Sequence, residues 1–381
     1  MILGRRENKK SAKFNYYYDY TLLFVTLFLV CFGLIMIYST SSYNASRKLG
    51  DPTYYLTRQG MFGLLGIGAM IIVSKVDYHI FFKPLPIIRM RPVTLLYWLC
   101  MGLQAYVLAF GREINGAKRW IDIGPLGTFQ PSELTKIAVI LMTAYIINLA
   151  PRSLDKIWGF LKVVLYVAPV IFLVLIPNFS TALVMICIMV GMSFIASRKK
   201  AYFIICGIII IAIGCYFVFG VSYRSQRVDV WRNVETHEKG YQILQGLYAI
   251  SSGGLFGRGL GESMQKLGFI PESHNDMIFS VICEELGLVG AVALIFVFMI
   301  LVWRLFIIAV NSPDLPGGLI ASGVLVHIAV QVLLNIAVVT NSIPSTGIPL
   351  PFISYGGTSL VVLLIEMGIV LSVSNQIKYE R

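Results

Sequence analysis

The chain has 381 residues, of which 57% are hydrophobic and only 13% are charged. Because about a quarter of the residues in a soluble domain are charged, this composition excludes an ordinary soluble enzyme and predicts a membrane protein with many spans. The net charge of +12 accompanies no nucleic-acid-binding motif, so we attribute it to contact with anionic lipid and expect no nucleic-acid partner.

Cysteine and histidine patterns exclude two further kinds of site. The six cysteines all lie in apolar runs without a CxxC motif, and the four histidines are scattered. The sequence therefore predicts neither disulfides nor a Cys/His metal site.

Apolar runs long enough to cross a bilayer follow one another through the chain. A crossing helix needs about 20 residues, and the first run lacks the cleavage site of a signal peptide. We expect an all-α polytopic membrane domain over residues 20–376, with tails at 1–19 and 377–381. Its ten spans lie near residues 21–40, 59–76, 93–110, 132–149, 157–177, 181–197, 202–222, 277–303, 317–341 and 358–375.

Lysine and arginine residues give the expected orientation. Ten spans put both termini on one side, and that side holds 18 of the 31 Lys and Arg residues, including the basic tail and two short connectors. Because short cytoplasmic connectors are rich in Lys and Arg, we expect cytoplasmic termini. The Gly- and Pro-rich loops at 111–131, 223–276 and 342–357 then face outside, the longest of them between the seventh and eighth spans. Because most of the polar, Gly-rich and Pro-rich segments then lie on one side, we expect the functional site at the outer face.

The first outer loop leads into a span that carries two charges. In "QPSELTK", Pro131 suits the first turn of a helix, and Glu133 and Lys136 lie three residues apart on one face, with the acid first. We interpret them as a functional pair, because ionisable residues within a membrane are functional candidates by default. The alternative is a structural ion pair, or a lysine that reaches the interface.

The outer loops supply cations beside aromatic residues and glycines. Lys118 and Arg119 precede Trp120, and the long loop contributes Arg227 among other arginines. Arginine suits bidentate phosphate contacts, and the backbone of "SSGGLFGRGLGES" can approach a ligand closely. These features favour an anionic ligand, with a flexible covering loop as the alternative for the glycines.

Four carboxylates stand in and beside "GFIPESHNDMIFSVICEELG", at the start of the eighth span. Asp276 shares a helical stripe with Ser280 and Cys283, whereas Glu285 faces the opposite side. We expect Glu284 and Glu285 to be structural, bonded between helices. Near lipid, Asp276 should have a raised pKa, which suits a general base acting on a sugar hydroxyl. The alternative for Asp276 is a helix cap.

Three long stretches together resemble the SEDS family (shape, elongation, division and sporulation), which includes FtsW, RodA and SpoVE. They are "NGAKRWIDIG…FQPSELTK", "GYQILQGLYAISSGGLFGRGLGESMQKLGFIPESHNDMIFSVICEELG" and "STGIPLPFISYGGTSL". The resemblance covers nearly the whole chain and leans toward the FtsW and SpoVE branch. It implies a peptidoglycan glycosyltransferase of the bacterial plasma membrane, which polymerises lipid II at the outer leaflet during cell division or shape maintenance.

The resemblance also implies roles for individual residues. Asp276 matches the family's essential aspartate and would be the base, while Glu133 and Lys136 match its Glu and Lys. Lys136 and Arg119 would bind the leaving pyrophosphate, or a divalent cation, Mg or Mn, held at Asp276 would do so, and no other cofactor is expected. The same motifs suggest substrate contacts by Lys118, Arg227, Glu272, His274, Ser354 and Tyr355.

Two motifs depart from the family pattern. The family usually reads "HTDFIF" where this chain has Asn275 and Met277, and "PDLGT" where it has Asn178 and Ser180. A role of the acid replaced by Asn178 therefore does not transfer to this chain.

Two other function classes stay open. A lipid II flippase or transporter predicts ionisable groups near the bilayer midplane and an inverted repeat, and the sequence shows no clear repeat. A non-catalytic scaffold of the wall-synthesis complex would not require Asp276, Lys136 and Arg119. The resemblance implies partners in each case: a class B penicillin-binding protein transpeptidase and other divisome or elongasome membrane proteins.

Overall fold

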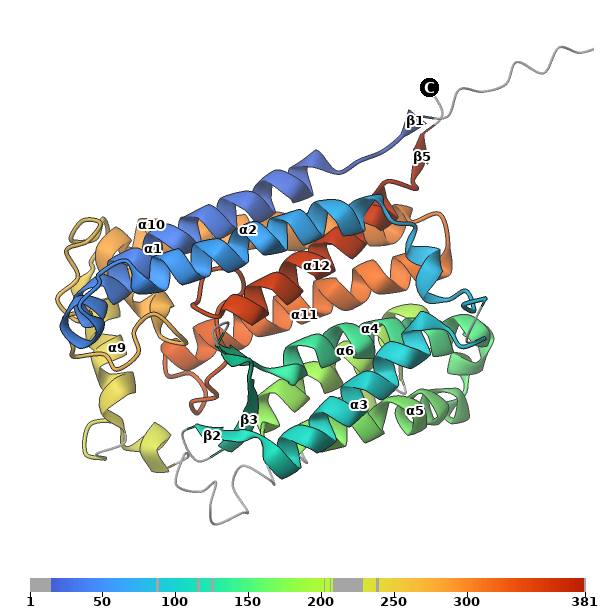
Figure 1. Cartoon of the computed structure of the whole chain (residues 1–381), viewed down its shortest axis with the longest axis horizontal. Coiled ribbons are helices and arrows are strands. Elements are labelled where there is room, and N and C mark those ends of the chain that lie inside the picture. The colour runs from blue at the N-terminus through green and yellow to red at the C-terminus, as the bar shows by residue number, and fades with distance from the viewer. Residues whose placement is uncertain are drawn as a thin grey trace, which may run out of the picture.

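The chain is a multi-pass membrane protein built from long apolar helices (Figure 1). The computed structural model describes residues 15–379 except 87–88, 115–116, 125–126, 202, 206, 208–228 and 238–239. Within these residues, nine helices are long and apolar enough to cross a membrane. They are α1 (Tyr20–Leu49), α2 (Tyr54–Lys75), α3 (Pro92–Phe110), α4 (Pro131–Leu149), α5 (Ile157–Leu175), α6 (Phe179–Ala196), α10 (Ile278–Asn311), α11 (Leu315–Val339) and α12 (Gly357–Ser374).

Nine of the ten expected spans coincide with these helices. The seventh, at 202–222, lies almost entirely outside the described residues. Helix α10 continues to Asn311 rather than ending near 303, because Arg304, which follows the apolar run, is paired: its Nη2 lies 2.7 Å from Asp19 Oδ2. Asp19 in turn caps α1 by accepting a hydrogen bond from the Leu22 N–H at 2.8 Å.

The expected all-α polytopic fold is confirmed, and short strands accompany it at the two ends of the bundle. The loop between α3 and α4 forms a sheet in the order β2 (Arg112–Ile114), β3 (Ala117–Asp122), β4 (Thr128–Phe129). β1 (Asn15–Tyr16) pairs antiparallel with β5 (Lys378–Tyr379), so the two expected tails are joined over these residues. Further short elements are η1 (Tyr78–Phe81), η3 (Pro151–Asp155) and α9 (Tyr241–Ser252), which precedes α10. The β1–β5 pair and α9 lie at opposite ends of the bundle (Figure 1).

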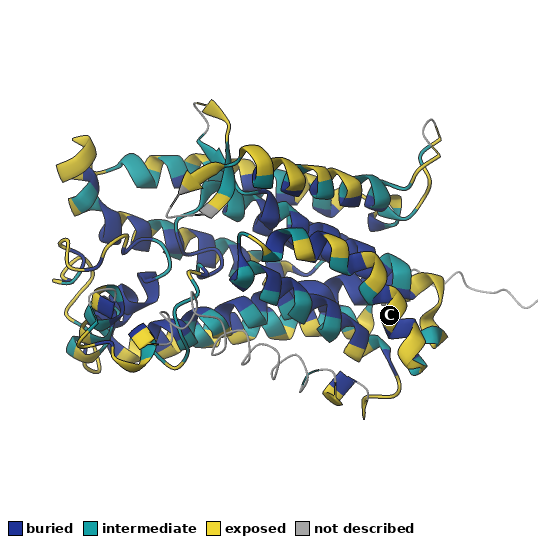
Figure 2. Ribbon diagram, turned by 90° about the horizontal axis from the view of Figure 1, so that it is seen from below, coloured by how far each residue is buried: buried dark blue, intermediate teal, exposed yellow. Residues whose placement is uncertain are grey.

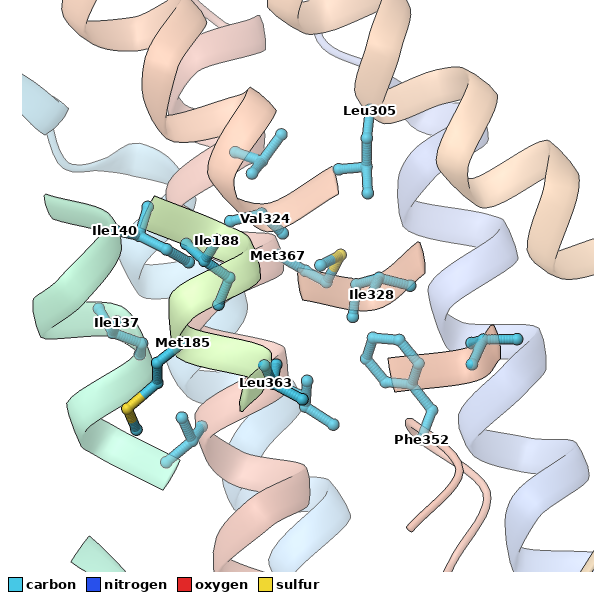
Figure 3. Close-up of a cluster of buried hydrophobic side chains, with 14 of the residues drawn as sticks. Ile137, Ile140, Met185, Ile188, Leu305, Val324, Ile328, Phe352, Leu363 and Met367 are labelled. Carbon is cyan, nitrogen blue, oxygen red and sulfur yellow. The ribbon is translucent and has the colours of Figure 1, made fainter. Parts of the chain in front are cut away.

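The core lies where α4, α6, α11 and α12 meet. Figure 3 shows side chains from these helices interlocking, among them Ile137, Ile140, Met185, Ile188, Val324, Ile328, Leu363 and Met367. Exposed residues lie along the outer helices (Figure 2). Leu64, Trp158 and Phe296 are among the exposed large apolar side chains. Apolar side chains turned outward are what a lipid-facing surface requires, so the inner helices are the ones that can bury polar groups.

Candidate active site

A buried ion pair lies in the first two turns of α4. The Nζ of Lys136 is 3.0 Å from Oε2 of Glu133, and both residues are more than nine-tenths buried. Pro131 begins the helix, as expected, and Ser359 of α12 donates to Glu133 Oε2 at 2.7 Å. The pairing expected from the sequence spacing is present, while its catalytic role stays a prediction.

Three buried residues that sequence analysis did not single out extend this pair into α11 and α12. Gln331 Oε1 accepts a hydrogen bond from Lys136 Nζ at 3.2 Å and lies 2.8 Å from His327 Nε2. His327 Nδ1 lies 2.8 Å from Glu366 Oε2. The available signal was the presence of two ionisable residues inside apolar spans, which are functional candidates by default.

Asp276 lies just before α10 rather than on it. The helix begins at Ile278, and the cap position, Met277, provides no side-chain hydrogen bond. The expected stripe of Asp276 with Ser280 and Cys283 is therefore wrong, because the chain is still in a turn at Asp276. Among the described residues, no hydrogen bond joins the Asp276 side chain to the first turn of α10, as the capping alternative requires.

The surroundings of Asp276 suit a proton acceptor. The side chain of Gln242 contacts the Asp276 carboxylate, with Nε2 3.4 Å from Oδ1. Burial raises the pKa of Asp276, and the nearby negative charge of Glu272 adds to the rise. The direction of this pKa shift agrees with the sequence-based expectation.

One turn of α11 brings Asp276 and Lys136 toward each other. Asn335 donates to the backbone carbonyl of Asp276 at 2.9 Å, and Gln331, four residues earlier, bonds Lys136. Four helical residues span about 6 Å. Both amides also donate to carbonyls of the Pro/Gly segment, which we define as residues 342–356 between α11 and α12. The two candidates thus approach the same short stretch of the molecule.

A pocket opens beside this turn of α11. Residues 349–352 and 354–356 of the Pro/Gly segment line it together with Gln331, Ser359, Leu360 and Leu363. Gln331 and Ser359 are the residues bonded to Lys136 and Glu133, so the ion pair lies behind the pocket wall. Neither Lys136 nor Asp276 lines the pocket, and the expectation that both open to one cavity stays a prediction.

Two further substrate-binding candidates, Ser354 and Tyr355, line this pocket and are tied to the turn before α10. Ser354 Oγ donates to the Asn275 carbonyl at 2.7 Å, and the Tyr355 N–H donates to the His274 carbonyl at 2.9 Å. The rings of His274 and Tyr355 lie 5.5 Å apart, both beside Tyr55. Burial lowers the pKa of His274 to about 4, so this imidazole is neutral near pH 7.

The candidate Glu272 is exposed, and its φ of 48° is unusual for a residue with a side chain. Its carboxylate accepts a hydrogen bond from Asn275 Nδ2 at 2.9 Å. The departure at Asn275 therefore has a local structural role. Likewise, Asn178 caps α6 by accepting from the Thr181 N–H at 3.2 Å.

The cationic candidates Lys118 and Arg119, in the loop between α3 and α4, are placed differently from each other. Lys118 is exposed on β3, whereas Arg119 Nε donates to the Pro177 carbonyl, in the link between α5 and α6, at 2.7 Å. Arg227 lies outside the described residues. Arg58 of α2, which sequence analysis missed, lies against the same loop, since a Cβ at Gly127 would be 3.1 Å from its Nη2.

The deep carboxylates hold the long loop before α10, and Glu285 alone also reaches another helix, as was expected of both. Glu285 Oε1 lies 2.8 Å from Lys266 Nζ and accepts from Ser39 Oγ of α1 at 2.6 Å. Glu284 accepts from Ser263 Oγ at 2.5 Å and from the Met264 N–H at 3.1 Å. Among the residues that the structure describes, no three His, Cys, Asp or Glu side chains form a metal-binding group, and the divalent cation stays a prediction.

Comparisons with known proteins place this chain in one family. The family model described as "Cell cycle protein" (FtsW, RodA, SpoVE) matches residues 20–379. A probable peptidoglycan glycosyltransferase FtsW of Geobacter sp. (strain M18) is 36% identical, over 95% of this chain and 98% of the relative. Stage V sporulation protein E of Bacillus subtilis (strain 168) shows the same identity and coverage. These names agree with the leaning toward the FtsW and SpoVE branch.

Solved structures share the fold. A chain from "Structural coordination of polymerization and crosslinking by a peptidoglycan synthase complex" superposes with a TM-score of 0.76 at 28% identity, covering 94% of this chain and 98% of that one. The rod shape determining protein RodA of Thermus thermophilus superposes with a TM-score of 0.68 at 28% identity, covering 94% and 97%.

Proposed function

Because the chain belongs to the FtsW, RodA and SpoVE family of cell cycle proteins, we propose that it is a peptidoglycan glycosyltransferase that polymerises lipid II. The enzyme would sit in the plasma membrane of a bacterium and work at the outer leaflet, in cell division or shape maintenance. The observation that carries the proposal is the buried Lys136, which stands behind a pocket and within one turn of α11 from Asp276.

The reaction joins the 4-hydroxyl of an acceptor sugar to the anomeric carbon of the growing glycan, while the bond to undecaprenyl pyrophosphate breaks. Asp276, with its raised pKa, would take the hydroxyl proton. Two Lys136 protons are bound by Glu133 and Gln331. Among the described residues no partner takes the third, which would stabilise the leaving pyrophosphate. Arg119 would assist from the loop before α4.

A divalent cation, Mg or Mn, would fit at Asp276. Its carboxylate has one long polar contact from a side chain, and Mg is commonly bound by one or two carboxylates together with substrate phosphates. When bound there, the ion would neutralise charge on the pyrophosphate. The similarity to a chain of a peptidoglycan synthase complex supports a class B penicillin-binding protein transpeptidase as partner, with other divisome or elongasome membrane proteins around it.

The test is polymerisation of labelled lipid II by the purified full chain, with and without the cognate transpeptidase, followed by gel analysis of the glycan. We expect long glycan chains when the partner is present. If the complex makes none while the partner alone still crosslinks added glycan, the polymerase proposal is wrong.

One observation favours a transporter as the second candidate function. His327 and Glu366 lie about halfway along α11 and α12, and ionisable groups at such depth are typical of transport pathways. Vesicles with labelled lipid II on one leaflet distinguish the two candidates. The polymerase proposal expects glycan formation without movement of lipid II between leaflets.

A further inference from the structure

We propose that His327 and Glu366 are positioning residues that hold the Lys136 ammonium in place through Gln331. The inference rests on the proposed function, since Lys136 is the group that would face the leaving pyrophosphate. Its basis is a continuous buried chain of hydrogen bonds, with distances of 2.8, 2.8 and 3.2 Å, from Glu366 through His327 and Gln331 to Lys136.

The Gln331 side chain can have only one orientation. Its Nε2 donates to the carbonyl of Pro349 at 3.0 Å, and a carbonyl accepts but does not donate. The Gln331 oxygen must therefore point at Lys136 and His327. If the amide were turned over, its NH₂ group would face the ammonium and Lys136 would lose an acceptor in a buried site.

The orientation of Gln331 in turn fixes which nitrogen of His327 carries a proton. Because Gln331 Oε1 is an acceptor, the neighbouring Nε2 must be protonated. The contact between His327 Nδ1 and Glu366 Oε2 then holds one proton, on either atom. Both arrangements leave the His327–Glu366 pair with no net charge, and both keep Nε2–H aimed at Gln331. The contact with Glu366 holds the His327 ring with Nε2–H toward Gln331, this N–H and the Pro349 carbonyl together hold the amide, and the amide oxygen accepts from Lys136.

The energetics favour function over stability as the reason for this pair. His327 and Glu366 are fully buried, and Glu366 Oε1 is without a hydrogen-bond partner in the described part of the chain. Replacing a buried ionic pair with apolar side chains is often neutral or stabilising. If the pair served only to join α11 to α12, apolar side chains would stabilise the helix contact as well or better. A role in orienting Lys136 explains why the hydrogen bonds run from Glu366 through His327 and Gln331 to Lys136.

The test compares purified full-length variants with the cognate transpeptidase and labelled lipid II. In the double variant His327→Leu/Glu366→Leu we expect kcat to fall about 10- to 100-fold, as for a misplaced catalytic group, with a smaller change in KM. The thermal midpoint should be unchanged or higher. Glu366→Gln, which can still donate to Nδ1, should recover most of the rate lost in Glu366→Leu. Thr143→Val, a buried change on α4 at a hydroxyl that has no hydrogen-bond partner in the described part of the chain, should match the wild type.

The outcomes separate the inference from the proposed function. If the wild type polymerises lipid II and the well-folded double variant does so equally fast, the inference alone is wrong. If the two leucine substitutions lower kcat by the same factor in a Gln331→Leu background as in the wild-type background, the route through Gln331 is wrong. If the wild type makes no glycan, both proposals fail together.

If the leucine variants do not fold, a spectroscopic measurement on the wild type still tests the proposal. The chain has four histidines, so ¹⁵N-histidine NMR of the wild type shows the signals of four imidazoles. Substituting the other three histidines one at a time assigns the remaining signals to His327. We expect His327 with a protonated Nε2. A neutral His327 protonated on Nδ1 would overturn the proposal.

Discussion

Asp276 combines a raised pKa with few side-chain hydrogen bonds, and this combination separates catalysis from capping at the scale of the residue. Since Met277 occupies the cap position without a side-chain bond, Asp276→Asn should change stability by only a few tenths of a kcal/mol. Loss of a general base should lower the polymerisation rate by about 10²-fold or more. A stable Asp276→Asn protein that still makes long glycan chains would remove Asp276 from the mechanism.

The pH dependence of the rate provides a second test at Asp276. A base must be ionised, and burial raises the pKa of this carboxyl above the ordinary value of about 3.9. The rate should therefore rise with pH along an acid limb that lies above that of an exposed carboxyl. We expect Glu272→Gln to move the limb to lower pH, because it removes a negative charge that raises the pKa. An acid limb that does not move would contradict the assignment.

Substitutions at Lys136 and Glu133 test whether their ion pair takes part in catalysis. Lys136→Met keeps much of the side-chain volume but leaves Glu133 buried without its cation, so some loss of stability is expected. The double variant Glu133→Gln/Lys136→Met removes that unpaired charge. We expect both variants to insert into the membrane and neither to polymerise lipid II at more than about 1% of the wild-type rate. Near-normal synthesis by the double variant would exclude the leaving-group role.

At the scale of the element, α10 depends on a break at Gly287. This residue has φ 67° and ψ −170° inside the helix, and a Cβ there would lie 2.3 Å from the Gly257 nitrogen. The loop between α9 and α10 fills the break, since the N–H groups of Arg258 and Gly259 donate to the carbonyls of Glu284 and Glu285 at 3.0 Å. Gly287→Ala should therefore cost about 1–3 kcal/mol from backbone conformation alone, and more from the clash.

The thermal midpoint in detergent measures this effect. Gly102→Ala is the matched control, because a Cβ at Gly102 of α3 meets open space, and Ala is the better helix former. It should leave the midpoint unchanged or raise it. Equal midpoints for the two variants would show that the break in α10 is not under constraint.

Hydropathy predicted the described spans because each of these helices contains an apolar stretch long enough to cross a membrane. The helix ends depend on contacts that hydropathy does not represent. Helix α10 passes the expected end because Arg304 is neutralised by Asp19, which is 285 residues away in sequence. Helix α1 extends to Leu49 through polar residues and stops where Gly50 adopts φ 74°. The local pair Glu133–Lys136 was predictable because both residues lie on one helix.

At the scale of the whole molecule, the rest of the candidate site depends on packing between distant helices. His327 and Glu366 are 39 residues apart, and nothing in their local sequences indicates that α11 and α12 bring them together. The same holds for Asn335 and Asp276. Conversely, Arg119 was predicted from its motif to bind substrate, and the structure places its Nε on the Pro177 carbonyl. Motifs thus identified candidate residues, but the tertiary fold decides which of them share one pocket.

A cluster around His79 joins three parts of the chain at the end of the bundle that carries the termini. His79 Nδ1 lies 2.6 Å from Asp77 Oδ1, and its Nε2 lies 2.6 Å from Asp314 Oδ2, at the start of α11. Asp77 also accepts from Gln376, just after α12, at 2.7 Å. Partial burial opposes protonation of His79, but the hydrogen bonds and charges of the two aspartates outweigh it and raise the pKa of the imidazole.

This cluster predicts that stability of the whole chain falls as pH rises above neutral. A raised pKa means that the folded state holds the His79 proton more tightly than the unfolded state, whose pKa is about 6.5. The stabilisation is complete below that pH and disappears as pH rises through the folded pKa. Asp77 does not contribute to the slope here, because hydrogen bonds outweigh its partial burial and lower its pKa to about 2. Thermal midpoints in detergent between about pH 6 and pH 9 should therefore fall for the wild type and vary less for His79→Gln. Parallel curves for the two proteins would show that the proton on His79 does not hold these three parts together.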